Sequence, residues 1–195
     1  MINWPRALAV VSGIAAGGAV LGGAAYVGLV TAAVPIDLGI GRRVRPLGPL
    51  GIQIDAPREI VFAVIAAPYG ERVPRSLQQK VQVLERGTDM VLAAHYTPVR
   101  WRLRATTVEV VRFRPPERVD FRLVRGPVPH VSESFLLDKR GDATTLTYEG
   151  ELGTDLWTMG RLWGNAVADQ WESVVKASFD TIKTEAEARA SRRRD

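Results

Sequence analysis

The sequence contains no cysteine and only two histidines, His95 and His130, in 195 residues. The absence of cysteine excludes disulfides, thiolate metal sites and a cysteine nucleophile. Two histidines are too few for a multi-histidine zinc site, so we expect no bound metal. The chain also lacks a glycine-rich phosphate loop, and we expect no cofactor. Lysine is scarce as well, so that the net charge of +5 comes largely from arginine, a side chain that suits phosphate groups.

The first long segment without charge runs from Ala7 to Val34. It exceeds the roughly 20 residues that a helix needs to cross a bilayer. A cleaved signal peptide is the competing interpretation, but its apolar core is only about 7 to 15 residues long. We therefore predict that residues 1–34 form an uncleaved N-terminal transmembrane anchor.

Small residues in this segment recur at a spacing of four, at Gly13, Gly17, Gly18 and Gly22. Such spacing lets a second transmembrane helix approach closely, so a helix partner is possible; a helix rich in small residues can also simply tolerate the pattern. The arginines that flank the segment set its orientation: one precedes it, and three follow it closely, Arg42, Arg43 and Arg45. The positive-inside rule then predicts a single-pass protein of the cell membrane whose C-terminal domain lies in the cytoplasm.

The rest of the chain divides into a linker at 35–49, a folded domain at 50–190 and a basic tail at 191–195. In the folded domain, Ile52 and Ile54 alternate with polar residues as in a half-buried strand, and Pro57 is a favoured first residue of a helix. Strand patterns joined by tight turns follow, and such strands pair antiparallel. From Asp155 onward the apolar period is helical, which predicts one long amphipathic helix capped by Thr154 or Asp155.

This order of elements, with the segments IQIDAPREIVFAVI, PPERVDFRLVRG and GDATTLTYEGEL, resembles the START-like or SRPBCC superfamily of polyketide cyclases and Coq10-like proteins. The resemblance implies an α+β helix-grip fold, in which a curved antiparallel sheet wraps around a long C-terminal helix. It also implies a hydrophobic cavity for a lipid, isoprenoid quinone, polyketide or similar ligand. The superfamily has no universal catalytic residue, so we assign none. The segment APYGERVPR lacks the Tyr-Pro-Trp-like sequence that often follows the first helix, which leaves the ligand class open.

Several residues are expected to line that cavity because they lie on the apolar faces of the predicted strands and helix. They are Trp101, Phe113, Phe121, Glu133, Phe135, Tyr148, Trp163, Val167 and Trp171. The aromatic ones fit a packed core equally well. Glu133 alternates with apolar residues, so it could orient a ligand or act as a base; it could also reach water or an arginine near the strand end.

The arginines of the middle strands are expected on the solvent face of the sheet, partly paired with Glu109 and Asp120. They are not interleaved with exposed aromatic residues, so we predict no nucleic acid binding. Arg42, Arg43 and Arg45 are expected to contact anionic membrane lipid.

Three functions remain open at this point. The first is a membrane-anchored domain that binds or transfers an apolar small molecule, because a tethered pocket exchanges ligand with the bilayer at high effective concentration. The second is an accessory subunit of a membrane protein complex. The third is a cyclase or dehydratase that uses Glu133 with a histidine or tyrosine.

Overall fold

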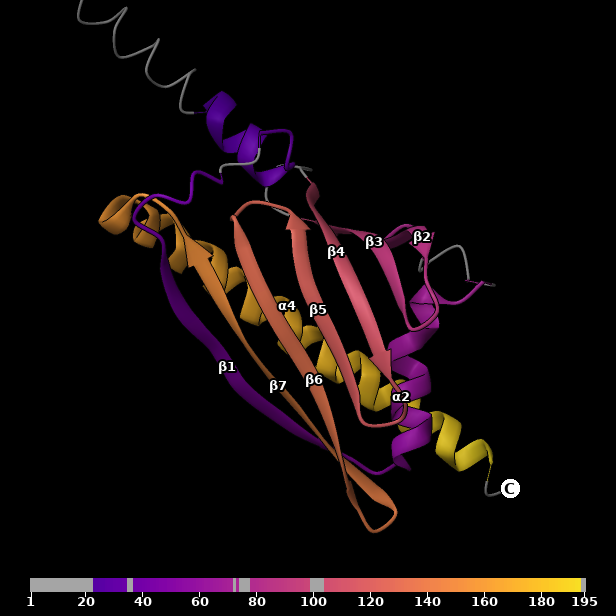
Figure 1. Cartoon of the computed structure of the whole chain (residues 1–195). Helices are drawn as coiled ribbons and strands as arrows, with labels where there is room; N and C mark the ends of the chain where they lie inside the picture. Colours follow the sequence, from indigo (N-terminus) through magenta and orange to yellow (C-terminus); the bar gives the residue numbers. More distant parts are fainter. Residues whose placement is uncertain (1–22, 35–36, 72, 74–77, 99–103, 194–195) are drawn as a thin grey trace, which may run out of the picture.

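A seven-stranded antiparallel sheet forms the body of the protein (Figure 1). The structure is a computed structural model that describes residues 23–34, 37–71, 73, 78–98 and 104–193. The strands lie in the order β1-β7-β6-β5-β4-β3-β2. Their bounds are β1 Arg43–Ile54, β2 Val81–Arg86, β3 Met90–Pro98, β4 Arg104–Arg114, β5 Arg118–Arg125, β6 His130–Arg140 and β7 Ala143–Thr154.

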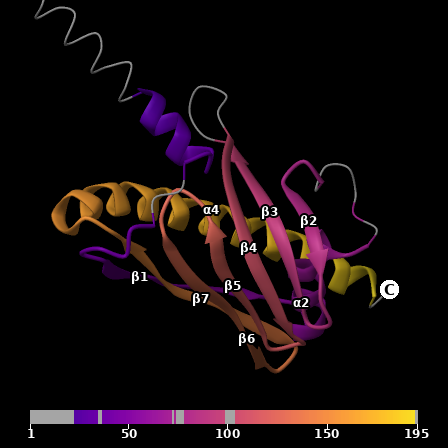
Figure 2. The same ribbon diagram turned by 45° about the horizontal axis from the view of Figure 1, so that its top comes forward.

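The helices cover one face of this sheet (Figures 1 and 2). Helix α2, Arg58–Ala66, follows β1 and leads into a short 3-10 turn, η1, Ala67–Tyr69. The long helix α4, Trp157–Arg192, runs across the sheet and packs against β1, β7 and α2. The core lies between the sheet and the two helices, as the helix-grip prediction requires.

Alternation along the strands places their apolar side chains in that core. In β6, Val131, Phe135 and Leu137 are buried and face α4, while Ser132 and Leu136 face outward. On α4 the buried residues recur at intervals of three, four or seven, which keeps them on one side of the helix. They are Gly164, Ala168, Val175, Phe179, Ile182, Ala186 and Ala190.

The prediction that Thr154 or Asp155 caps α4 is wrong. The residue before the helix is Leu156, in a left-handed conformation with φ of 67°, and no side chain caps the end. Asp155 turns back toward the residues before β1 and accepts hydrogen bonds from the N–H groups of Leu38 (2.6 Å) and Gly39 (2.8 Å). Its carboxylate therefore ties the residues before β1 to the start of α4.

Strand β1 begins inside the segment that the sequence indicated as a linker. Arg43 pairs with Thr154 of β7, and the pairing continues to Ile54. Its proline and glycine residues are typical of loops, so the sequence pattern did not indicate a strand here. They are accommodated because β1 is an edge strand and its register shifts between Leu47 and Leu50.

The predicted membrane segment falls only partly on the described residues, of which 23–30 are helical. Within the part of the chain that the structure describes, no helix is long and apolar enough to span a bilayer. The four glycines predicted to contact another helix, Gly13, Gly17, Gly18 and Gly22, lie outside the described residues.

Candidate functional site

A buried carboxyl group, that of Glu133, lies in the interior between the sheet and α4. Its oxygen Oε2 accepts a hydrogen bond from the Tyr148 hydroxyl (2.6 Å) and another from Nε1 of Trp171 (2.7 Å). The three residues come from β6, β7 and α4, which join only in the folded protein. The other oxygen, Oε1, accepts no hydrogen bond from any described residue, so it can accept one from a ligand.

A glycine directly opposite makes room for this side chain. Gly150 of β7 pairs with Glu133 across the strands. A Cβ atom at Gly150 would lie 2.7 Å from both the Cβ of Glu133 and the carbonyl oxygen of Ser132. Any larger residue would therefore displace Glu133 or separate the two strands.

Burial sets the protonation state of Glu133. It removes the carboxylate from water and is the largest cause of a pKa raised well above the usual value for glutamate; the charge of Glu109 raises it further. The hydrogen bonds from Tyr148 and Trp171 act in the opposite direction but do not cancel these effects. Glu133 therefore keeps its proton at neutral pH and can donate as well as accept hydrogen bonds.

A second polar cluster lies on the neighbouring strands and was missed by the sequence analysis. Glu109 of β4 is buried and accepts a hydrogen bond from the Thr107 hydroxyl (2.6 Å). Its Oε2 lies 3.3 Å from Nδ1 of His95 on β3. The other ring nitrogen of His95, Nε2, is 2.9 Å from the hydroxyl of Tyr69 in η1.

The prediction that Glu109 lies on the solvent face and pairs with arginines is therefore wrong. Glu109 alternates with Thr107, Val111 and Phe113, and this face of β4 points toward the helices. Arg104 and Arg112 lie on the opposite, outer face of β4. Their nearness in the sequence suggested ion pairs with Glu109, which was therefore assigned to the wrong face. The same period of two that placed Glu133 inside could have placed Glu109 there.

Burial also perturbs both titratable groups of this second cluster. It raises the pKa of Glu109 to about 7 and lowers the pKa of His95 from 6.5 to about 4. His95 is therefore neutral at pH 7, and its contact with Glu109 is not an ion pair. Nδ1 of His95 is buried and has no hydrogen-bond partner among the described residues, although Glu109 lies nearby.

Aromatic rings surround the two clusters. Phe135 packs against Phe121, Tyr148 and Phe179, with ring centroids 5.3 to 5.8 Å apart. Phe113 lies on the other side of the interior, 5.5 Å from the ring of Tyr69. The predicted lining residues Phe113, Phe121 and Phe135 thus face the interior.

The three lining residues predicted on α4, Trp163, Val167 and Trp171, are all half-buried and pack against the core. Trp163 lies nearer the start of the helix, where its Nε1 donates a hydrogen bond to the carbonyl of Pro127 (2.8 Å) and its ring meets Tyr26. Trp163 is therefore not among the residues that contact Glu133. Trp101 lies outside the described residues.

The arginines predicted to contact lipid differ in whether their charge is paired. Arg42 is paired with Asp155 (2.8 Å) and with Asp37, so its charge is already compensated. Arg43 and Arg45 line a hollow of about 250 Å³ between β1, β7 and the start of α4.

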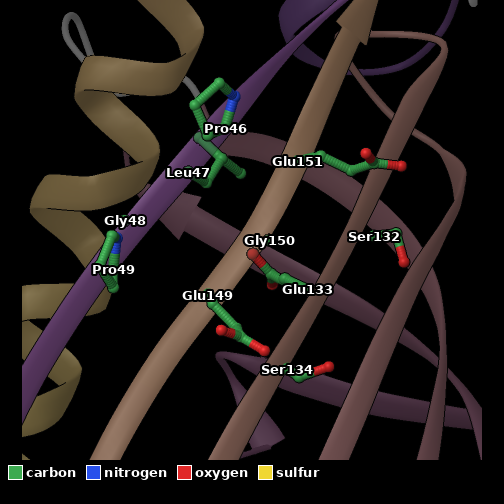
Figure 3. Close-up of a pocket in the computed structure, with 10 residues that line it drawn as sticks. All are labelled: Pro46, Leu47, Gly48, Pro49, Ser132, Glu133, Ser134, Glu149, Gly150 and Glu151. Atoms are coloured by element: carbon green, nitrogen blue, oxygen red, sulfur yellow. The ribbon is translucent and has the colours of Figure 1, made fainter.

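A larger hollow of about 420 Å³ lies on the opposite, outer face of the sheet (Figure 3). Ser132, Ser134, Glu149 and Glu151 line it, and these residues alternate along β6 and β7 with the inward-facing ones. Glu133 and Gly150 also belong to its lining, so this hollow adjoins the strand positions that hold the buried carboxyl group. Among the described residues, no group of three or more histidine, aspartate and glutamate side chains could hold a metal.

Comparisons with known proteins identify the fold. No family model and no curated protein matches the sequence. Solved structures match it in three dimensions. A Thermus thermophilus protein, TTHA0849, has a TM-score of 0.58 at 14% identity, over 76% of this chain and 99% of that one. The Zhui aromatase/cyclase of Streptomyces sp. R1128 has a TM-score of 0.55 at 18% identity, over 79% and 96%.

The chain has the helix-grip fold. This confirms the fold implied by the sequence resemblance. The di-domain aromatase/cyclase BexL, of the BE-7585A biosynthetic pathway, also matches, with a TM-score of 0.54 and 17% identity over 77% of this chain. This chain spans 50% of BexL, about half the length of that protein. At these identities the comparisons establish the helix-grip fold alone.

Proposed function

We propose that this protein binds an apolar molecule carrying a hydroxyl or similar polar group in the interior between the sheet and α4. The observation that carries the proposal is the geometry of Glu133. Its carboxyl group is buried, is held in place by Tyr148 and Trp171, and keeps one oxygen available. Burying a polar group without a full set of partners costs free energy, and a ligand that supplies the missing hydrogen bond recovers it.

The surroundings of Glu133 determine the rest of the ligand. Phe121, Phe135 and Val167 offer apolar contacts, and no positive charge faces Glu133 within the described residues. A negatively charged ligand would be repelled by Glu133 or Glu109 whenever either carboxyl group loses its proton. A neutral molecule with a hydrocarbon body and one or two hydroxyl groups, such as an isoprenoid alcohol or a quinol, fits this chemistry.

A membrane location is the second part of the proposal. It is supported by the uncharged run from Ala7 to Val34, which is long enough to cross a bilayer, and by the arginines that follow it. An anchored domain of this orientation would lie on the cytoplasmic side of the cell membrane. It would take its ligand directly from the lipid phase.

Farnesol, an apolar chain with one hydroxyl group, tests the binding site. The full chain in lipid nanodiscs would be titrated with farnesol while the indole N–H signals of the tryptophans are followed by NMR. We expect the signal of Trp171 to move and that of Trp163, nearer the start of α4, to stay. Farnesene, which lacks the hydroxyl group, should bind about tenfold more weakly.

The variant Glu133→Leu should abolish this tenfold preference, because it removes the hydrogen-bonding carboxyl group. Glu149→Leu, on the outer face of the same sheet, is the matched control and should keep it. A Trp171 signal that stays fixed up to the solubility limit of farnesol would contradict the proposed site.

An acid–base enzyme is the second candidate, favoured by the pairing of buried acids with a neutral histidine. A protonated Glu133 could donate a proton to a leaving hydroxyl group, and neutral His95 could accept one from carbon. Two of the proteins of similar structure are named aromatase/cyclases. If the chain dehydrates a β-hydroxy ketone, Glu133→Gln should lower the rate at least about 100-fold. Unchanged turnover in Glu133→Gln would exclude Glu133 as the acid of such an enzyme.

A further inference from the structure

Large apolar side chains are exposed mainly at one end of the molecule. Of the eleven that are exposed among the described residues, nine belong to 26–44 or to the first turns of α4. They are Tyr26, Val27, Val34, Leu38, Ile40, Val44, Trp157, Met159 and Leu162. We call this set the apolar end. A concentration of this kind indicates a surface that is covered in the working protein.

Backbone contacts hold the parts of the apolar end together. The N–H groups of Leu156 and Trp157 donate hydrogen bonds to the carbonyls of Ile40 (2.9 Å) and Gly41 (3.1 Å). Trp157 has a φ of 48°, which is costly for a bulky residue, yet its side chain remains 54% exposed. Trp157 thus keeps an unfavourable backbone conformation although it remains largely exposed to solvent.

An uncompensated group of arginines adjoins the apolar end. Arg43 and Arg45 occupy the face of β1 that points toward α4, and they line the hollow of about 250 Å³ together with Arg161 and Asn165 of the helix. Arg45 donates a hydrogen bond to the amide oxygen of Asn165 (3.1 Å). None of the three arginines forms an ion pair with a described residue. Three like charges around one hollow attract an anion.

The described part of the uncharged segment, residues 23–34, lies at this same end (Figures 1 and 2). The ring of Tyr26 packs edge-on against Trp163 of α4, with centroids 6.2 Å apart. Arg125 of β5 donates hydrogen bonds to the carbonyls of Ala32 (2.7 Å) and Ala33 (3.3 Å). These contacts hold residues 26–33 against the apolar end, rather than against another face.

We infer that the apolar end docks on a lipid bilayer and that the hollow between β1 and α4 holds the phosphodiester headgroup of an anionic phospholipid. Trp157, Met159 and Leu162 enter the interfacial region, where tryptophan is favoured. Arg43, Arg45 and Arg161 bind the headgroup phosphate. The inference rests on the membrane location in the proposed function, but not on the binding of any ligand in the interior.

The absence of cysteine allows a direct test with single labels on the full chain. An environment-sensitive fluorophore is attached to Met159→Cys, and the chain is reconstituted in vesicles that contain nitroxide-labelled phosphatidylcholine. The control is Leu84→Cys, whose site is exposed and apolar but lies on β2 at the other edge of the sheet. We expect lipid nitroxides to quench the label at position 159 at least threefold more strongly than the label at 84.

The headgroup is tested by lipid composition and by charge. Adding phosphatidylglycerol to pure phosphatidylcholine vesicles should increase quenching at position 159. Arg43→Gln with Arg161→Gln should lower the ratio of docked to undocked domain by roughly 30-fold, because each arginine near an anionic surface contributes about a fivefold factor. Arg104→Gln with Arg122→Gln removes the same charge from the outer face of the sheet and should change nothing.

Equal quenching at positions 159 and 84 would overturn the docking surface. Quenching at 159 that is the same with and without phosphatidylglycerol would overturn the headgroup site. If the label at 159 is shielded in detergent, before any bilayer is present, the apolar end is covered by protein and the inference fails. None of these readouts depends on a ligand near Glu133, so the proposed binding function stands or falls separately.

Discussion

At the scale of single residues, the interior holds two carboxyl groups that no positively charged side chain among the described residues compensates. Glu133 and Glu109 each accept hydrogen bonds from neutral donors, and burial raises the pKa of both. Such groups are expensive to keep in a core, where apolar residues would pack at lower cost. Two perturbed carboxyl groups in one interior are the strongest reason to propose this region as a functional site.

The raised pKa of Glu133 predicts how stability depends on pH. As pH rises above the ordinary glutamate value of 4.5, the unfolded chain releases a proton that the native state retains. Stability therefore falls with rising pH, by about 1.4 kcal/mol per pH unit for each retained proton. Glu133→Gln has no proton to retain and should show a shallower fall between pH 6.5 and 8 in denaturant unfolding. Glu149→Gln, an exposed control, should match the wild type; an unchanged slope in Glu133→Gln would refute the raised pKa.

His95 should remain neutral down to a pH near 4, because burial lowers its pKa to about that value. The unfolded chain takes up the proton near pH 6.5, so this residue contributes stability that is lost as pH falls from 6.5 toward 4. The ring carbon signals of the histidines report this by NMR, with assignment from His95→Gln. A midpoint of titration near 6.5 would mean that the ring is open to water.

At the scale of elements, Asp155 connects the chain before β1 to the start of α4. Its carboxylate accepts two backbone N–H groups and pairs with Arg42, and these contacts hold its pKa below the usual range. Removing it leaves donors of Leu38 and Gly39 without a partner.

Asp155→Ala should lower the free energy of unfolding by about 2 to 3 kcal/mol at pH 7. The loss should shrink as pH falls through the lowered pKa, because the wild type then loses the same contacts. Asp180→Ala, an exposed aspartate on α4, should change stability by no more than about 0.5 kcal/mol. Urea unfolding of the two variants provides the comparison, and equal stabilities would show that Asp155 does not hold the two elements together.

Elements with regular periodicity could be predicted from the sequence. The strands around Phe121 and Phe135 and the long helix with Val175 and Phe179 follow simple periods, and Glu133 was placed inward on the same basis. The start of β1 could not be predicted, since Pro46 and Gly48 are tolerated only because the strand lies at the sheet edge. The turn of Asp155 toward Leu38 is a contact between distant parts of the chain, which no local pattern encodes.

The second polar cluster could not be predicted from the sequence for the same reason. Tyr69, His95 and Glu109 come from η1, β3 and β4, and their meeting depends on the packing of three elements. The period of two indicates which face of β4 Glu109 occupies, but charged neighbours on the opposite face favoured the wrong choice. The sequence alone thus predicted half of the buried polar site.

At the scale of the whole molecule, the two proposed sites lie in different places. The interior site lies between the sheet and the middle of α4, and the apolar end lies around the first turns of the same helix (Figure 1). If the apolar end docks on a bilayer as proposed, α4 connects that bilayer with the interior site. A molecule leaving the lipid phase at the apolar end would need to move only along α4 to reach Glu133.

Two neighbouring residues of β5 allow a bulky side chain to be added either inside or outside the sheet. Leu123 is half-buried and faces the core, whereas Val124 is 61% exposed on the outer face. Leu123→Trp should therefore fill the interior and displace a ligand. Val124→Trp adds a similar bulk outside the sheet and should leave binding unchanged.

Native mass spectrometry can show directly whether a ligand occupies the interior, with the full chain released from nanodiscs made of its own host's lipids. We expect a reproducible adduct with the mass of a neutral apolar molecule, retained by Val124→Trp and lost from Leu123→Trp. A spectrum that contains only the bare chain in all three proteins, or an adduct that Leu123→Trp retains, would contradict a ligand site between the sheet and α4.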